Sequence, residues 1–173
     1  MSNKGRRVCP VERAGGLDSK IRRWVQDPQK ILGPYIQEGM TVLALGCGPG
    51  RVIASDLQEG MLDRLRDKIR GTELADRIIL HKCENDKIGV PTPVDFILAF
   101  YMAHEVPDKG QFFAELGSIL KPAGQILITE PPFHVSKRAF ETTVTVANEA
   151  GLTDLERPRM FPNKAVLLSK ARH

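Results

Sequence analysis

Apolar residues along the chain fall into two patterns, short continuous runs and longer stretches in which they recur every three or four positions. The short runs are rich in Val, Ile and Leu and have the length of strands buried on both faces of a sheet. They predict strands over residues 42–45, 51–56, 77–82, 94–100, 125–130, 152–157 and 165–169. The longer stretches predict amphipathic helices over residues 58–70, 108–120 and 136–150, with two short helices before residue 37.

Strands and helices alternate from residue 41 onward, and the last two strands follow each other without a helix. This order predicts an α/β fold with a doubly wound, mostly parallel seven-stranded sheet and an antiparallel edge strand. The expected domain spans residues 40–173, and residues 1–39 are expected to form an N-terminal arm with short helices.

Three glycines at alternate positions follow the first predicted strand, in the sequence Leu-Gly-Cys-Gly-Pro-Gly over residues 45–50. Glycine lets the backbone turn sharply and approach a ligand closely. A buried strand that ends in such a loop is how doubly wound folds hold a nucleotide-like cofactor. The spacing matches neither the dinucleotide fingerprint nor the P-loop, and a tight turn without a ligand is the alternative.

Asp56 closes the second predicted strand. In a doubly wound sheet, an acid at this position accepts hydrogen bonds from the ribose hydroxyls of a nucleotide-like ligand. The alternative is that Asp56 caps the helix that begins near Gln58. The neighbouring glycine loop favours the ribose interpretation.

Four segments, in the right order, resemble the class I S-adenosylmethionine (SAM)-dependent methyltransferases, in particular the type 11, quinone-biosynthesis-like group. They are residues 42–50, 52–62, 94–108 and 120–130, the last with Leu-Lys-Pro-Ala-Gly where the family has Leu-Lys-Pro-Gly-Gly. Ala44 departs from the family, which usually has an acid there to position the methionine amino group. The resemblance implies a set of cofactor-binding residues, namely Leu45, Gly46, Cys47, Gly48, Gly50, Asp56, Leu57, Cys83, Glu84 and Phe100.

Two of these residues follow the third predicted strand, where the family has an acid-containing turn that hydrogen-bonds the adenine amino group. Cys83 stands about where that acid is expected. The backbone of Cys83 and Glu84, or the carboxylate of Glu84 or Asp86, would then serve instead. A solvated acidic turn is the alternative.

The resemblance places the substrate beside the segment that follows the fourth predicted strand, over the sulfonium of the cofactor. His104 is the candidate general base, because histidine titrates near neutral pH. Tyr101 is the candidate for orienting the substrate. The alternatives are structural, a histidine that caps the loop and a tyrosine that only packs. Residues 130–132, Glu-Pro-Pro, are expected to border the substrate mouth.

The connection between the first two predicted strands is unusually short. Neighbouring parallel strands normally need a crossover of about a dozen residues, usually a helix, and the family has a helix directly after its glycine loop. That helix is apparently missing here. Either the sequence omits a segment of the native chain or the chain has a true deletion. We favour omission, which an intact mass well above 19.2 kDa would show and a matching mass would exclude.

The composition is that of a globular protein, with 42% hydrophobic and 27% charged residues. No apolar run approaches the roughly 18 residues of a membrane span, and the polar, basic N-terminus resembles no secretory signal. A cytoplasmic protein is therefore expected. The three cysteines form no Cys-x-x-Cys pair, so neither a disulfide framework nor a metal site is expected.

The net charge is +4, and many basic residues lie before residue 24. They would suit an RNA partner, although a solvated basic face is the simpler interpretation. The sequence thus predicts SAM-dependent methyl transfer to a small-molecule acceptor, with His104 and Tyr101 as candidate catalytic residues. The alternatives are a non-catalytic methyltransferase-like binding or regulatory protein and an RNA methyltransferase. The sequence does not indicate an oligomeric state.

Overall fold

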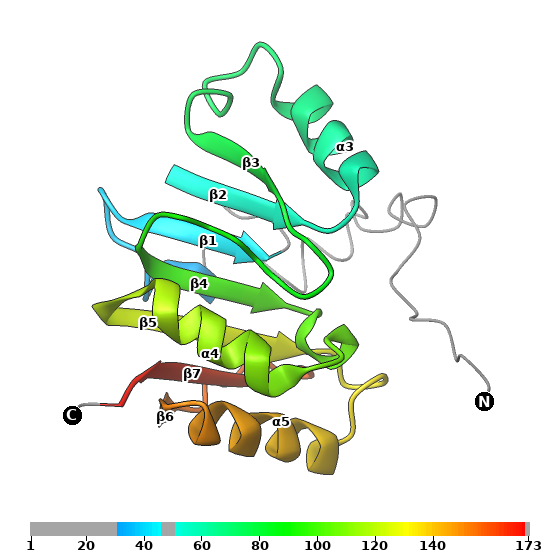
Figure 1. Cartoon of the computed structure of the whole chain (residues 1–173), viewed down its shortest axis with the longest axis vertical. Helices are drawn as coiled ribbons and strands as arrows, with labels where there is room; N and C mark the ends of the chain where they lie inside the picture. The colour runs from blue at the N-terminus through cyan, green and yellow to red at the C-terminus, as the bar shows by residue number, and fades with distance from the viewer. Residues whose placement is uncertain (1–30, 46–50, 172–173) are drawn as a thin grey trace.

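A computed structural model describes residues 31–45 and 51–171 of the chain. Its centre is a seven-stranded sheet in the order β3-β2-β1-β4-β5-β7-β6 (Figure 1). The strands are β1 (Thr41–Leu45), β2 (Arg51–Asp56), β3 (Ile78–Lys82), β4 (Val94–Phe100), β5 (Leu120–Glu130), β6 (Leu152–Glu156) and β7 (Lys164–Lys170). The predicted α/β fold with a mostly parallel seven-stranded sheet is confirmed.

The antiparallel part of the sheet lies at the end formed by the last two strands. β7 runs antiparallel to both of its neighbours, β5 and β6. Because of this direction, β7 begins where β5 ends, with Lys164 paired to Glu130. The segment before β7 is therefore brought to the edge at which the parallel strands finish.

The structure corrects the prediction at the start of β5, which begins at Leu120 rather than at residue 125. The preceding helix ends at Ile119, and Leu120 already pairs with Val94 of β4 before a shift in register. Gly124 allows this close approach, since a Cβ there would lie 2.7 Å from Leu120 Cδ1 and 2.9 Å from the Asp95 carbonyl oxygen. The Leu-Lys-Pro-Ala-Gly segment is thus part of an irregular strand, not a turn between elements.

The three predicted helices of the domain are confirmed as α3 (Glu59–Ile69), α4 (Lys109–Ile119) and α5 (Lys137–Glu149). The side chains of Asp108 and Ser136 cap α4 and α5 by accepting hydrogen bonds from backbone N–H groups of their first turns. A short 3-10 helix, η2 (Ala103–Glu105), follows β4. No helix in the described ranges is long and apolar enough to cross a membrane.

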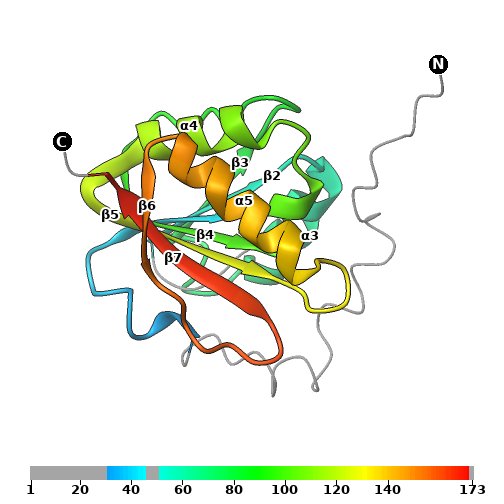
Figure 2. The same ribbon diagram turned by 90° about the horizontal axis from the view of Figure 1, so that it is seen from below.

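The two faces of the sheet are covered differently. On one face, α4 and α5 lie together and bury an apolar cluster that includes Ile97, Ile126, Phe113 and Phe140 (Figures 1 and 2). On the other face a second cluster contains Val42, Phe96 and Leu127, with Leu32 from the segment before β1 and partly buried residues such as Leu65 of α3. The first of the two short helices predicted before residue 37 lies outside the described residues. Of the second, the structure describes the end, where residues 31–32 are helical and Leu32 is buried.

The structure pairs β1 and β2 in parallel, with Thr41 beside Arg51 and Ala44 beside Ala54. Only residues 46–50 connect the two strands, too few for a helical crossover. The connection has to return about 13 Å along the sheet, and six Cα-to-Cα steps can span about 20 Å. The short link is therefore compatible with parallel pairing, contrary to the expectation that about a dozen residues are required. The question of omission or deletion stays a prediction for intact mass.

Candidate active site at the carboxyl ends of the strands

The carboxyl ends of the five parallel strands β1 to β5 meet at one edge of the sheet, which we call the carboxyl edge. Ligands of open α/β sheets bind at this edge. Most of the predicted site residues that the structure describes lie there, at or just after the ends of β2, β3 and β4. They are Asp56, Leu57, Cys83, Glu84, Phe100, Tyr101 and His104.

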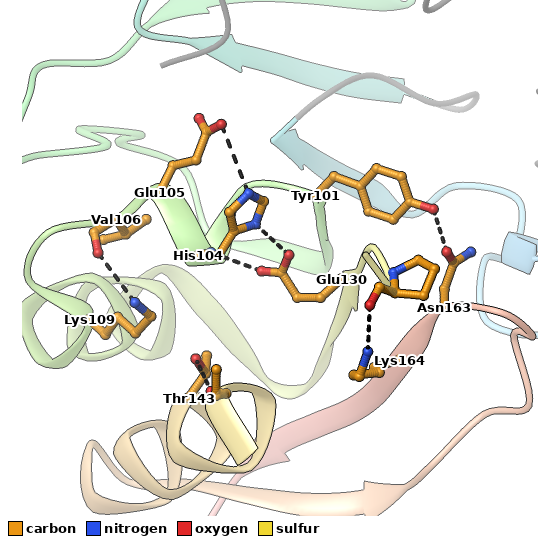
Figure 3. A network of polar contacts seen from close by, with 11 residues as sticks. Tyr101, His104, Glu105, Val106, Lys109, Glu130, Thr143, Asn163 and Lys164 are labelled. Atoms are coloured by element: carbon orange, nitrogen blue, oxygen red, sulfur yellow. Dashed lines mark hydrogen bonds and ion pairs between the residues drawn. The ribbon is translucent and has the colours of Figure 1, made fainter. Parts of the chain in front are cut away.

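His104 is held by a carboxylate that ends β5 (Figure 3). Its Nδ1 lies 2.6 Å from Glu130 Oε2, and its backbone N–H donates to Glu130 Oε1 over 2.9 Å. Glu130 is only 1% exposed, so the carboxylate has both oxygens committed to one residue in a buried position. This arrangement fixes the imidazole ring and leaves Nε2 as the nitrogen that can face a ligand.

The charges around His104 favour its protonated form. The hydrogen bond and charge of Glu130 raise the pKa of His104, and Glu105 adds to this, whereas burial and Lys109 oppose it. Glu105 Oε1 lies 4.0 Å from His104 Nε2. Burial, together with the charges of Glu130 and Asp56, raises the pKa of Glu105, although His104 lowers it. The edge therefore concentrates negative charge around one histidine.

Tyr101 is held in an unusual backbone conformation beside the same site. Its φ is +58°, in the left-handed region that non-glycine residues rarely adopt. The phenol donates a hydrogen bond to Asn163 Oδ1 over 2.5 Å, and the ring stacks on Phe100 with 4.3 Å between the ring centroids. Such strain is kept only where the surroundings impose it, and it is typical of functional sites.

Asp56 lies at the end of β2, half buried. Its Oδ1 accepts a hydrogen bond from the backbone N–H of Gln58 over 2.8 Å. Gln58 is the N-cap residue of α3, so Asp56 shapes the turn directly before the helix without being its N-cap, and its contact with ribose stays a prediction. Burial raises the pKa of Asp56, although hydrogen bonds from Gln58 and Leu57 oppose this.

The turn after β3 uses its own polar groups internally. Cys83 Sγ lies 2.6 Å from Ser55 Oγ, and the Cys83 N–H donates to the Asp56 carbonyl oxygen. Burial raises the pKa of the Cys83 thiol, despite the lowering effect of Ser55. The Glu84 N–H donates to the Lys87 carbonyl oxygen. Since both amides are engaged, the exposed Glu84 carboxylate is the better candidate for an adenine contact.

Several predicted cofactor residues lie where the structure says little. Gly46, Cys47, Gly48 and Gly50 are outside the described residues, and of Leu45 only its place at the end of β1 is described. Ala44 is completely buried in the second apolar cluster. The chain thus has no carboxylate at the position where the family usually has one.

The described residues fit the adenosine half of SAM by the chemistry of their donor set. Asp56 would supply a carboxylate for ribose hydroxyls, Glu84 or Asp86 would supply one for the adenine amino group, and Phe100 with Leu57 would supply apolar surface. No group of histidine, cysteine, aspartate or glutamate residues in the described ranges could hold a metal ion.

Sequence reasoning placed Glu130 only at the border of the substrate mouth and missed its contact with His104. A buried acid at the end of a strand was the available signal, since a buried carboxylate needs a partner. Asn163 was missed completely. It lies 62 residues from Tyr101 in the sequence and no local pattern marks it.

Comparison with known proteins agrees with this geometry. Residues 37–128 match the methyltransferase domain family model, and the chain belongs to that family. It is 28% identical over 137 residues to the ubiquinone/menaquinone biosynthesis C-methyltransferase UbiE of Geobacter sulfurreducens, with 69% of this chain and 53% of the relative covered. It is 31% identical over 133 residues to the demethylmenaquinone methyltransferase of Lactobacillus johnsonii, with 73% and 48% covered. The chain spans about half the length of these curated relatives.

Solved structures share the fold. A SAM-dependent methyltransferase from Aquifex aeolicus superposes with a TM-score of 0.78 at 24% identity, covering 93% of this chain and 98% of that chain. A putative S-adenosyl-L-methionine-dependent methyltransferase from Methanococcus maripaludis gives a TM-score of 0.76 at 16% identity, covering 100% and 99%. The chain therefore has a fold that is known from solved structures.

Proposed function

We propose that the protein transfers the methyl group of SAM to a small-molecule acceptor that carries an acidic proton. The observation that carries the proposal is the His104–Glu130 pair at the carboxyl edge of a methyltransferase-family domain. A histidine fixed through Nδ1 by a buried carboxylate has the geometry of a general base that acts through Nε2. Asp56, at the same edge, supports binding of the ribose of SAM.

The residues of the chain supply the proton chemistry. When bound, SAM supplies an electrophilic methyl group attached to its sulfonium sulfur, and S-adenosylhomocysteine is the leaving thioether. His104 Nε2 accepts the acidic proton of the acceptor, and the deprotonated acceptor then attacks the methyl group. Glu130 then stabilises the imidazolium through the hydrogen bond at Nδ1. Tyr101, fixed by Asn163, orients the acceptor against the ring of Phe100.

The curated relatives narrow the proposed acceptor to the quinone type. The Geobacter relative is named for ubiquinone and menaquinone biosynthesis, and the Lactobacillus relative for demethylmenaquinone. For an aromatic diol of this kind, removal of a hydroxyl proton increases the electron density at the neighbouring ring carbon. In this proposal His104 takes that hydroxyl proton, and the neighbouring ring carbon attacks the methyl group of SAM. The hydrogen on that carbon is then lost as a proton, and His104 returns a proton to the oxygen, which restores the aromatic diol.

The direct test is turnover with SAM and a demethylated naphthoquinol, followed by the appearance of S-adenosylhomocysteine and methylated product in mass spectrometry. The expected result is acceptor-dependent formation of both products, lowered about 100-fold in the H104A variant because a general base contributes that order of rate. Turnover that H104A leaves unchanged would contradict the assigned base. No turnover with any acceptor, although SAM binds, would contradict catalysis.

A non-catalytic binding protein is the second candidate function. Ala44 and the five-residue link between β1 and β2 favour it, because both weaken the part of the site that holds the methionine portion of SAM. Binding of SAM without turnover would support this alternative.

The basic residues that suggest RNA lie before residue 31, outside the described residues. The cytoplasmic location stays a prediction, and neither the sequence nor the structure indicates an oligomeric state.

A further inference from the structure

Two phenylalanines stand out on the described surface because nothing covers them. Phe133 is 93% exposed and Phe161 is 94% exposed, whereas the other exposed large apolar residues described lie between 38% and 57%. Single apolar side chains on a surface need no explanation. Two almost completely exposed aromatic rings need one if they share a location.

They do share a location, at the carboxyl edge beside the proposed acceptor site. Phe133 lies in the loop that follows β5, and Phe161 in the loop that precedes β7. The pairing of Glu130 with Lys164 brings these loops together, and Lys164 Nζ donates to the Pro132 carbonyl oxygen over 3.5 Å. Both rings thus flank the edge on which His104 and Tyr101 lie.

Each loop is anchored by an apolar residue close to the exposed ring. In the first loop, Val135 is only 4% exposed and belongs to the cluster under α4 and α5. In the second, Met160 packs against the opposite cluster and accepts a hydrogen bond from Thr129 through its sulfur. Each loop therefore packs one apolar side chain, Val135 or Met160, against the core and leaves the nearby phenylalanine exposed to solvent.

Basic residues lie in these two loops and in the adjoining first residues of α5 and β7. Residues 131–138 and 157–164 contain Lys137, Arg138, Arg157, Arg159 and Lys164, with no aspartate or glutamate. Lys137 and Arg138 begin α5, whose first turn has no acidic residue. Cations are unfavourable at a helix N-terminus, so this placement does not serve the stability of α5. Only Arg157 is paired within the protein by the described acids, Glu141 and Asp154.

We propose that these two loops, together with the start of α5, dock on an anionic lipid surface. Exposed aromatic rings partition into the boundary between headgroups and acyl chains, and surrounding lysine and arginine side chains attract anionic headgroups. The four basic residues other than Arg157 supply the charge that complements such a surface, and the two rings supply the apolar contact. Docking in this orientation turns the mouth beside His104 toward the bilayer, from which an apolar acceptor can enter.

The test is co-sedimentation of the full chain with vesicles of phosphatidylcholine alone or of phosphatidylcholine with phosphatidylglycerol. The wild-type protein is expected to bind the anionic vesicles at least about tenfold more tightly, because each basic residue near the surface adds to the attraction. The F133S/F161S double variant and the K137Q/R138Q double variant are each expected to lower that binding about tenfold or more. Since all variants keep the basic residues before residue 24, the differences report on the two loops.

L74S is the matched control, because Leu74 is 44% exposed and precedes β3, at the opposite edge of the sheet. It is expected to bind vesicles like the wild type. Equal binding by F133S/F161S and the wild type would overturn the proposal. A dimer in size-exclusion chromatography that F133S/F161S disrupts, without vesicle binding, would also overturn it and assign the edge to a second copy of the chain. Vesicle binding does not require methyl transfer, so failure of either proposal is seen separately.

Discussion

The two halves of the carboxyl edge are built in different ways. The proposed acceptor half (Tyr101, His104 and Glu130) lies at the ends of β4 and β5, which pair with each other in the middle of the sheet over α4 and α5. The cofactor half (Asp56, Cys83 and Glu84) lies on β2 and β3, where β3 is an edge strand with Ile79 57% exposed.

The difference also appears in the partners of the charged groups. Glu130 is buried and reaches a residue 26 positions away, so tertiary packing sets its geometry. Asp56 is held by the backbone of its own turn, two residues away. We conclude that the proposed catalytic pair is preformed by the core, whereas the proposed cofactor contacts rest on local turns. Changes in the acceptor half should therefore affect rate, and changes in the cofactor half should affect affinity for SAM.

The largest effect is expected from E130Q. The side-chain oxygen can still accept from the His104 N–H, but an amide N–H would then face Nδ1 and place the imidazole proton on Nε2. The base would be lost, with a fall in turnover of about 100-fold or more. E105Q is the control, because Glu105 lies 4.0 Å from Nε2 and does not orient the ring. Equal turnover by E130Q and the wild type, measured at saturating SAM, would exclude Glu130 as a positioning residue.

The pH dependence should separate rate from stability within the acceptor half. The raised pKa of His104 means that the neutral base accumulates only as the pH rises through that value. Turnover should therefore increase about tenfold per pH unit below the pKa and then level off. A kcat profile that is flat from about pH 6 to about pH 9 would contradict a role for His104 as base.

The contribution of His104 to the stability of the fold should change with pH in the opposite direction to turnover, falling as the pH rises. A group whose pKa is raised by folding stabilises the protein fully below its unfolded-state pKa of about 6.5 and loses this contribution as the pH rises through the folded value. The melting temperatures of the wild type and H104A should therefore differ most near pH 6 and converge at higher pH. A difference that grows with pH would be inconsistent with the His104–Glu130 ion pair.

A smaller effect is expected from Y101F, which removes one hydrogen bond to Asn163. The free energy of unfolding should fall by about 0.5–1.5 kcal/mol, measured by denaturant titration. Y35F is a matched control, since the Tyr35 hydroxyl donates to Glu156 over 2.5 Å and also bonds across a large distance in sequence. Both variants should lose similar stability, but only Y101F should raise the KM for the acceptor. An unchanged KM in Y101F would reduce Tyr101 to a packing role.

The sequence predicted most of the fold because the strands are continuous apolar runs between clear helix signals. The caps at Asp108 and Ser136 and the positive φ of Gly71 and Gly151 are local features, and local patterns identify them. The start of β5 was mispredicted because Pro122 and Gly124 indicate a turn in isolation. Only the pairing of Leu120 with Val94 makes this segment a strand.

The site was predictable to the extent that strand ends define it. Asp56 ends one predicted strand and His104 follows another, so the topology of the sheet brings both residues to the carboxyl edge. The His104–Glu130 contact joins residues 26 positions apart in the sequence, and the Tyr101–Asn163 contact joins residues 62 positions apart. Such contacts depend on the register of β5 and β7, which no local pattern determines.

Calorimetric titration with SAM, comparing the wild type with D56A, tests the division of the carboxyl edge most directly. The account predicts that the wild type binds SAM and that D56A binds it more weakly by about 1–3 kcal/mol, from loss of a charge-assisted hydrogen bond to ribose. D63A, on the exposed side of α3, should bind like the wild type, and E130Q should retain SAM affinity. If D56A bound SAM as tightly as the wild type, Asp56 would only shape a turn, and the cofactor half would have to be placed elsewhere.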